Sequence, residues 1–350
     1  LGLRVLMDFV PNHWSSSHPS FQAALSDKRS DHVAWYSFKK WPDQYETFFG
    51  VKDLPKINLR HPQARNHVLE AVRYWLDFGV DGFRLDYAIG PARDFWADFC
   101  KVTRETKPDC WTFGEVVEPS DSQLSFYGLL DGCLDFILLE AMRQTFAYRR
   151  WDARKFTDFL DRHEAHFPGD FSRPSFLDNH DMNRFLWVIR GDMQRLKIAA
   201  LCQFTLAGPP VIYYGTEVGL SQSRDVRQGG KGILEESRLP MLWDGEQDDD
   251  LLAYYSELIQ LRKAHRCLRR GSRKTIAAGS DIIAYQRQEG ECCLLILINL
   301  SDELRTFEVS GNWTRVLFKT DRVCESRNLT EFTQVTLDGL SGMILGNLPA

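Results

Sequence analysis

Short apolar segments alternate with amphipathic segments along most of this chain, and that alternation limits what the chain can fold into. We predict buried strands for apolar segments near 3–8, 80–86, 110–115, 132–137, 174–178 and 209–213. We predict helices for amphipathic segments near 62–78, 91–107, 138–149, 153–165, 192–206 and 251–265. Strands that alternate with helices in this way form a parallel sheet whose faces the helices cover.

Polar and charged residues close four of these predicted strands. The four segments are Asp8-Phe-Val-Pro-Asn-His13, Gly82-Phe-Arg-Leu-Asp86, Phe113-Gly-Glu115 and Phe176-Leu-Asp-Asn-His-Asp181. Together they supply several acids, two histidines and an arginine. In a β/α barrel, side chains at the carboxyl ends of the strands build the active site at one face. The sequence therefore predicts an α/β fold of the (β/α)8 TIM barrel type.

The predicted strands are too few to close such a barrel. We count six parallel strands in the sequence, whereas closure needs eight. A natural minimal barrel would leave parallel edges unpaired. We therefore expect the chain to be part of a longer protein, lacking the first two strand–helix units of the barrel. We also expect these 350 residues, made alone, to be unstable or inactive.

The pattern changes after Gly271 into short strands with alternating polarity, such as 282–286 and 292–298. Alternation of this kind is typical of antiparallel sheets. We predict a partial catalytic barrel over 1–270 and a C-terminal antiparallel β-sandwich domain over 271–350.

Composition argues against several classes of function. The net charge of −5 and the pI near 6.0 give no electrostatic reason to expect nucleic acid. No apolar run approaches the length that spans a membrane. The cysteines match neither a zinc pattern nor a disulfide framework, which favours a reducing, cytoplasmic compartment. They are Cys100, Cys110, Cys133, Cys202, Cys267, Cys292, Cys293 and Cys324.

Arg84 and Asp86 share one side of the predicted strand 80–86, because side chains alternate along a strand. Phe83 and Leu85 then suit the side that the helices cover. Arg84 can hold the carboxylate of Asp86 ionised and oriented. A carboxylate that attacks the anomeric carbon of a sugar must have both properties. For this motif alone, a buried ion pair without chemistry is the alternative interpretation.

Glu115 closes the next predicted strand, so we expect its carboxyl group across a cleft from Asp86. Retaining glycosidases use two carboxyl groups about 5–5.5 Å apart, one attacking and one protonating the leaving oxygen. The acid needs a raised pKa, which a second carboxylate and apolar walls would supply. Gly114 would let the backbone pass close to a ligand. On its own, a surface glutamate is the simpler interpretation.

Two histidines lie at the same predicted rim. His180 precedes Asp181 after the strand 174–178, and His13 follows the strand 3–8. Such groups can bond sugar hydroxyls more strongly as positive charge develops on the ring. Either histidine taken alone is more often structural.

The four segments, taken in order, resemble the signature segments of the α-amylase family of glycoside hydrolases. Gly208-Pro-Pro-Val-Ile-Tyr-Tyr-Gly215 with Glu217, and Arg238-Leu-Pro-Met-Leu-Trp-Asp244, are similar to further segments of that family. The resemblance covers nearly the whole chain and is least specific after residue 270.

The resemblance implies a retaining glycoside hydrolase that cleaves α-glucosidic bonds in starch, other α-glucans or malto-oligosaccharides by double displacement. It implies Asp86 as nucleophile, Glu115 as acid/base and Asp181 as the third acid, which stabilises the transition state. It also implies three groups that hold the sugar in the cleavage subsite: His13, Arg84 and His180.

Two segments bear on the substrate. Tyr87-Ala-Ile-Gly90 stands where many amylases carry Lys-His and the neopullulanase group carries a glutamate, so specificity on the leaving-group side stays open. Leu54-Pro-Lys-Ile-Asn58 is similar to a segment of the neopullulanase and cyclomaltodextrinase group, which implies oligosaccharides or mixed α-1,4 and α-1,6 links. A transglycosylase and a non-catalytic amylase-like protein are the alternatives. The sequence predicts no oligomeric state.

Residues 14–58 lack regular periodicity but carry nine aromatic residues, so we predict an inserted loop subdomain there. Burial in its small core is the simpler interpretation for most of these rings. Trp14, next to His13, is the one best placed to stack on a sugar. Asn12 sits where some relatives bind calcium, but we find no set of six or more oxygen ligands and predict no metal and no cofactor.

Overall fold

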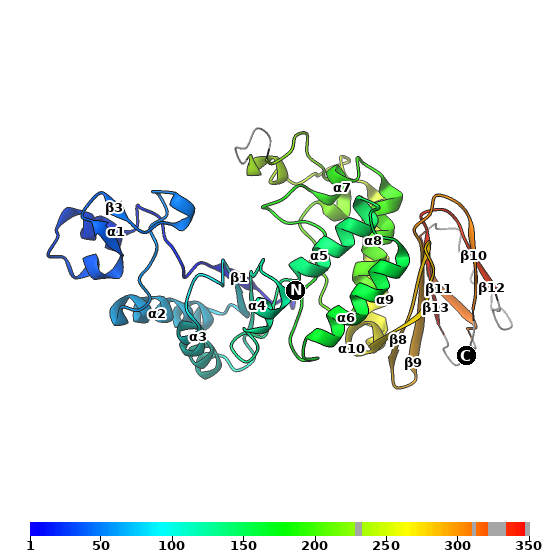
Figure 1. Ribbon diagram of the computed structural model, residues 1–350, viewed down its shortest axis with the longest axis horizontal. Helices are drawn as coiled ribbons and strands as arrows, with labels where there is room; N and C mark the ends of the chain where they lie inside the picture. Colours follow the sequence, from blue (N-terminus) through cyan, green and yellow to red (C-terminus); the bar gives the residue numbers. More distant parts are fainter. Residues whose placement is uncertain (228–232, 310–312, 321–333, 347–350) are drawn as a thin grey trace. The chain divides into compact units, whose positions relative to one another are not determined.

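The computed structural model describes residues 1–227, 233–309, 313–320 and 334–346 (Figure 1). They belong to two compact units, Leu1–Leu134 with Gly169–Ser172 and Asp135–Pro168 with Arg173–Ala350. The division into 1–270 and 271–350 rests on the sequence pattern and stays a prediction.

The first unit is built on a parallel sheet, which has the order β1-β4-β5-β6 in the described part of the chain. The strands are β1 (Leu6–Phe9), β4 (Gly82–Leu85), β5 (Trp111–Gly114) and β6 (Gly132–Cys133). The helices and helical turns are α1 (Pro19–Ser26), η1 (Asp31–Trp35), η2 (Phe48–Gly50), α2 (Pro62–Phe78), α3 (Arg93–Thr106) and α4 (Ser120–Leu124). A small hairpin joins β2 (Phe38–Lys40) to β3 (Gln44–Tyr45).

Helix α2 has the ends that the sequence predicts. Pro62 occupies the first turn, where its missing N–H costs nothing, and Gly79 ends the helix in the left-handed region with φ 118°. Helix α3 covers one face of the sheet through Phe99, whose ring lies 5.9 Å from that of Phe83 and 6.4 Å from that of Phe9. The predicted alternation along β4 is therefore confirmed.

The first strand differs from the prediction of a buried strand. Leu3 is 78% exposed, Val5 59% and Leu6 36%. Strand β1 pairs with β4 on one side, and no described strand pairs with its other edge. Because a neighbouring strand covers just one side of this edge strand, some of its apolar side chains stay in contact with water.

Residues 14–58 contain α1, the β2–β3 hairpin and two helical turns around a small aromatic core. Phe21, Trp35 and Tyr36 are buried, and the rings of Phe21 and Tyr36 lie 4.8 Å apart. Trp14 packs on His18, with ring centres 4.3 Å apart. Burial in the core therefore holds for Phe21, Trp35 and Tyr36, whereas Trp14 is partly buried.

The second unit begins with helices and ends with strands. Its helices and helical turns are α5 (Phe136–Met142), the π-helical turn η3 (Arg143–Ala147), α6 (Ala153–His166), α7 (Phe185–Val188), α8 (Met193–Thr205), η4 (Thr216–Val218), η6 (Leu234–Ser237), α9 (Asp249–Ala264) and α10 (Arg266–Arg270). Its strands are β7 (Ser272–Ala278), β8 (Ile282–Glu289), β9 (Cys292–Asn299), β10 (Arg305–Glu308), β11 (Arg315–Lys319), β12 (Gln334–Leu337) and β13 (Gly342–Gly346).

Two antiparallel sheets pack face to face at the end of this unit. The larger has the order β11-β13-β9-β8-β7, and β10 pairs with β12. The helices lie on one side of the larger sheet and the β10–β12 pair on the other (Figure 1). Both faces of strand β9 are therefore buried. Ile296 belongs to the core shared with the helices, and Leu297 belongs to the core between the two sheets.

Three predicted strands are shorter than expected. Strand β6 stops at Cys133 because Asp135 caps helix α5, accepting a bond of 2.9 Å from Leu138 N–H. The predicted strands near 174–178 and 209–213 meet in a single parallel bridge between Ser175 and Pro210. Proline has no N–H to extend a ladder.

In the part of the chain that the structure describes, no helix has the length and apolar character that crossing a bilayer requires.

Candidate active site

Arg84 is the centre of a polar cluster in the first unit. Its Nη1 lies 2.8 Å from Asp86 Oδ1 and 2.8 Å from Asp8 Oδ1. Its Nη2 lies 2.8 Å from Glu115 Oε1. The three carboxylates come from the carboxyl ends of β1, β4 and β5, which are neighbours in the sheet. One guanidinium therefore gathers both predicted catalytic acids of this unit.

The backbone beyond the strands holds the two acids in place. Asp86 N–H donates to the Phe9 carbonyl over 2.9 Å, and Glu115 N–H donates to the Leu85 carbonyl over 2.9 Å. Tyr87 has a φ of 42° and donates its N–H to Glu115 Oε2 over 3.2 Å. A left-handed tyrosine costs about 1–3 kcal/mol, so its surroundings must enforce this conformation.

The charge of Arg84 is held in place by its partners. Burial of the side chain, which is 12% exposed, works against the charge. Glu115, Asp8 and Asp86 outweigh that effect and raise the pKa of Arg84. The guanidinium is therefore a permanent cation between the acids.

His13 lies in the same unit, in a partly apolar setting. Its ring stacks on Phe48 with centres 4.1 Å apart, and Asn12 Nδ2 lies 3.2 Å from its Nδ1. Burial lowers the pKa of His13, Asp86 acts in the opposite direction, and Lys56 lowers it further. An amide nitrogen is a donor, so Nδ1 accepts and Nε2 carries the proton. This tautomer can donate a hydrogen bond to a sugar hydroxyl.

An exposed aromatic group lies next to this cluster. Phe49 is 77% exposed, and its ring lies 5.4 Å from that of Tyr87 and 4.3 Å from that of Phe48. Sugar faces stack on rings of this kind. The sequence pointed to Trp14 instead, because Phe48 reaches His13 and Phe49 reaches Tyr87 only through the fold of the 14–58 segment.

Gly114 has a different role from the predicted one. A Cβ there would lie 2.9 Å from Ala88 Cβ and 3.1 Å from Leu130 Cδ1. The glycine therefore makes room for these two side chains, not for a ligand.

The remaining predicted site residues belong to the second unit. His180 Nε2 lies 3.2 Å from Asp181 Oδ2, and Arg238 Nη2 donates to Asp181 Oδ1 over 2.8 Å. Arg238 Nε also donates to the His180 carbonyl over 3.0 Å. Both side chains of the predicted pair are partly exposed. That they converge with Asp86 and Glu115 around one sugar stays a prediction.

A buried acid supports the turn that carries Asp181. Asp178 accepts from Phe185 N–H over 2.7 Å and from Thr216 Oγ1 over 3.0 Å. Burial raises the pKa of Asp178, and the hydrogen bond from Phe185 works against that shift. From the other side, Arg143 donates to the Leu177 carbonyl over 3.0 Å.

Besides Phe48 and Phe49, sequence reasoning missed three contributors: Asp8 as a partner of Arg84, the left-handed backbone of Tyr87, and Arg238. Asp8 pairs directly with Arg84 in the parallel register of β1 and β4, so a register argument could have found it. Nothing in the sequence signals the conformation of Tyr87. Arg238 stands in a segment noted only for its resemblance.

No three His, Cys, Asp or Glu side chains gather into a metal site within the described ranges. Asn12 is buried, and its amide nitrogen faces His13.

Comparisons with known proteins identify the family to which this chain belongs. A family model described as the alpha amylase catalytic domain matches residues 1–248. Alpha-amylase 2 of Dictyoglomus thermophilum is 40% identical over 314 residues, which cover 89% of this chain and 55% of that protein. A cyclomaltodextrinase of a Bacillus species is 34% identical over 312 residues, 85% of this chain and 54% of that one.

Among solved structures, the cyclic α-maltosyl-(1→6)-maltose hydrolase from Arthrobacter globiformis matches with a TM-score of 0.86 at 25% identity. The match covers 99% of this chain and 75% of that one. A cyclomaltodextrinase structure matches with a TM-score of 0.84 at 29% identity, over 98% of this chain and 60% of that one.

The chain belongs to the α-amylase catalytic-domain family. The predicted resemblance and the α/β class with a C-terminal antiparallel β-sandwich are confirmed. The chain spans about half the length of the curated relatives it matches.

Proposed function

We propose that the protein is a retaining α-glucan glycosidase, with Asp86 as nucleophile and Glu115 as acid/base. The observation that carries the proposal is the shared guanidinium of Arg84, which bonds both acids at 2.8 Å. Two carboxyl groups on one guanidinium are close enough to act on opposite sides of one glycosidic bond.

The first half of the reaction breaks the glycosidic bond. Asp86 Oδ1 accepts from Arg84, so we assign Oδ2 to the attack on the anomeric carbon. The bond to the leaving glucan breaks as the new ester bond forms, and Glu115 protonates the leaving oxygen. Oε2, which accepts the longer bond from Tyr87 N–H, is the oxygen that we assign to this proton.

In the second half, Glu115 takes a proton from water, and the hydroxide oxygen attacks the anomeric carbon. The ester bond breaks and Asp86 leaves as a carboxylate, so the product keeps the α configuration. Asp181 stabilises the charge on the ring in both steps. Three groups hold the sugar: Arg84, His13 and His180.

We propose malto-oligosaccharides and related α-glucans as substrates. The names of the relatives support this class, since they include cyclomaltodextrinases and a maltogenic alpha-amylase of Bacillus acidopullulyticus. We also propose a cytoplasmic location. An intracellular maltogenic amylase of Bacillus subtilis is 28% identical, and the seven described cysteines are free thiols.

Two variants of the whole protein test the assignment. Asp86→Asn should lower kcat/KM about 10⁴-fold for both maltotriose and α-maltosyl fluoride, because the nucleophile is lost in each case. Glu115→Gln should lose hydrolysis of maltotriose to a similar extent but keep cleavage of the fluoride, whose leaving group needs no proton. Glu70→Gln, an exposed acid on α2, is the matched control and should change neither.

Product stereochemistry gives an independent measurement. Proton NMR during hydrolysis should show the α-anomer of the reducing sugar first. If the β-anomer formed first, or if the Asp86→Asn protein were fully active, the proposal would be wrong. Longer chains formed from maltotriose would instead reveal transfer to a sugar hydroxyl.

A further inference from the structure

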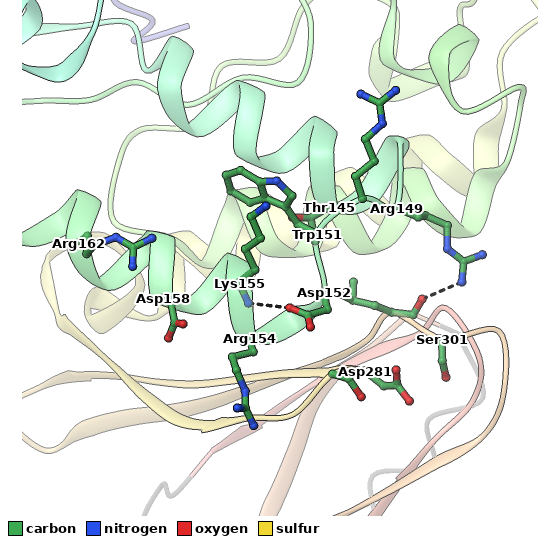
Figure 2. Close-up of a pocket in the computed structure, with 13 residues that line it drawn as sticks. Thr145, Arg149, Trp151, Asp152, Arg154, Lys155, Asp158, Arg162, Asp281 and Ser301 are labelled. Carbon is green, nitrogen blue, oxygen red and sulfur yellow. Dashed lines mark hydrogen bonds between the residues drawn. The ribbon is translucent and has the colours of Figure 1, made fainter.

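A cavity of about 570 Å³ lies in the second unit and shares no residue with the proposed catalytic set. It opens between the start of α6, the loop after η3, the β7–β8 turn and the loop after β9 (Figure 2). Its lining carries five cationic and three acidic side chains in a protein of net charge −5. This size falls within the range of small-molecule sites, about 300–1,000 Å³.

Some of these charged side chains already have partners within the protein. Arg149 Nη1 pairs with Asp302 at 2.9 Å, and Asp281 accepts from Arg305 over 2.8 Å. Asp152 caps α6 by accepting from Lys155 N–H over 2.8 Å, as Figure 2 shows. Because Asp152 already accepts from a backbone N–H at the start of α6, the N-terminus of that helix is not what would bind an anion here.

The remaining cations have no carboxylate within ion-pair distance among the described residues. They are Arg150, Arg154, Lys155 and Arg162. Arg154 and Arg162 stand eight positions apart on α6, which puts them on one helix face. One acid of the lining, Asp158, stands between them. The cavity therefore has a surplus of positive charge.

Trp151 gives the cavity an apolar wall. Its indole is half-buried against Phe159, with ring centres 5.7 Å apart. Lys155 Nζ lies 4.7 Å from the centre of the indole ring. Figure 2 shows the lysine side chain beside the ring. A cation and an aromatic surface thus lie next to each other.

Neutral polar groups complete the lining. Ser280 and Ser301 face the cavity together with Thr145, and Asp158 adds a carboxylate that can accept bonds from hydroxyls. An inorganic anion alone would gain nothing from acids and an indole. A ligand that carries hydroxyls, an apolar ring face and one strong anionic group would use all three kinds of surface.

We propose that this cavity binds a phosphorylated saccharide. The arginines of the lining that have no acidic partner, Arg150, Arg154 and Arg162, supply the positive charge for the phosphate monoester, since guanidinium groups match phosphate oxygens in pairs. Trp151, with the Lys155 side chain beside its ring, packs against the sugar, and the serine and threonine hydroxyls of the lining bond the sugar hydroxyls. The ligand has two sources that share this chemistry, a free sugar phosphate and a phosphate ester on a glucan chain.

Calorimetry on the whole protein tests the proposal with glucose 6-phosphate, glucose and inorganic phosphate as separate probes. Glucose 6-phosphate should bind at least tenfold more tightly than either other probe. The double variant Arg154→Gln/Arg162→Gln should lose at least tenfold in that affinity. The double variant Arg269→Gln/Arg270→Gln removes the same charge outside the cavity and should keep it.

A second measurement needs no variant. Glucose 6-phosphate should protect Lys155 from acetylation in a mass-spectrometric footprint. Lys197, which lies 5.7 Å from the Tyr254 ring, is the matched lysine elsewhere in this unit and should stay reactive. The two sources of ligand are distinguished by sedimentation of the protein with phosphorylated starch. Binding that phosphatase treatment of the starch abolishes indicates a phosphate ester on a glucan chain, and no binding to the starch indicates a free sugar phosphate.

Three results would overturn the proposal. Equal affinity for glucose 6-phosphate and inorganic phosphate would mean a general anion effect. Equal loss in both double variants would mean that net charge alone is responsible. No protection of Lys155 at saturating ligand would place any binding elsewhere. Because both double variants leave the proposed catalytic residues intact, basal maltotriose hydrolysis should be unchanged in each.

Discussion

The guanidinium of Arg238 bonds the carboxylate of Asp181, with 2.8 Å between Nη2 and Oδ1. The same side chain donates to the backbone carbonyl of His180 over 3.0 Å. Arg238 therefore holds both the carboxylate of the proposed third acid and the backbone turn that carries it. An acid that strengthens its bonds in the transition state must be oriented before the substrate arrives. We assign Arg238 as a positioning residue for Asp181.

Replacing Arg238 with methionine should lower kcat for maltotriose about 10–100-fold, because Asp181 loses its fixed orientation. Arg238→Lys should recover part of that loss, since one charged bond survives. Both partners are about 40% exposed, and such surface pairs add at most about 1 kcal/mol to stability. The melting temperature should therefore stay nearly constant. Inactivity that came only with unfolding would refute the positioning role.

Arg84→Lys tests the cluster of the first unit. A single ammonium group cannot reproduce bonds from two guanidinium nitrogens to Asp8, Asp86 and Glu115. We expect kcat/KM to fall about 100-fold while the protein stays folded. Arg84→Met should also destabilise the protein by about 3 kcal/mol, because it leaves three carboxylates without a cation.

Urea unfolding and maltotriose kinetics measure these two effects separately. Arg73→Lys is the control, because Arg73 is a partly exposed arginine that pairs with Glu70 at 2.7 Å. It should change neither quantity. If Arg84→Lys kept full activity, the guanidinium geometry would have no part in catalysis.

The pKa of His13 predicts a pH dependence of stability. Burial lowers the folded pKa from 6.5, so the unfolded chain takes up a proton at a pH at which the folded chain does not. This contribution to stability is therefore present above about pH 6.5 and is lost as the pH falls towards the folded value. In thermal melts between about pH 7 and pH 5, His13→Gln should lose less stability than the parent.

His18 also has a lowered pKa, mainly through burial, so His13→Gln should flatten the pH dependence only in part. The Asp86→Asn protein gives a second check. Asp86 works to raise the pKa of His13, so its neutralisation should lower that pKa further in an NMR titration. A rise would mean that the two groups do not face each other as described.

The sequence was sufficient where local rules decide the outcome. Side-chain alternation along a strand predicted that Arg84 and Asp86 share a face, and the 2.8 Å bond between them agrees. The same alternation puts the adjacent Cys292 and Cys293 on opposite faces of β9, where they pack against different cores. Helix ends followed from proline and glycine, as at Pro62.

Other features depend on contacts between distant segments. The place of Phe48 beside His13 needs the fold of the whole 14–58 segment, and the φ of 42° at Tyr87 is imposed by its surroundings. The exposure of Val5 depends on which strands flank β1. Residue type and periodicity carry no record of such relationships, so the sequence could not predict them.

Gly82→Ala tests whether the pairing of β4 with β5 supports the site. A Cβ at this position would lie 1.9 Å from the Trp111 carbonyl oxygen, which is backbone and has little freedom to move. We expect a loss of about 3 kcal/mol in the free energy of unfolding, at the upper end of overpacking effects. Activity should fall as well, because Arg84 lies two residues further along β4.

Gly169→Ala is the matched control in the same unit. A Cβ there meets no atom within 4 Å, and its φ lies outside the left-handed region. This change should be neutral or stabilise by about 0.5 kcal/mol, because alanine has less freedom to lose on folding. Urea unfolding of both variants distinguishes a local clash from a general effect of added methyl groups. Equal stability of the two proteins would mean that β4 can move away from β5 without cost, and the shared position of Asp86 and Glu115 on Arg84 would then need another support.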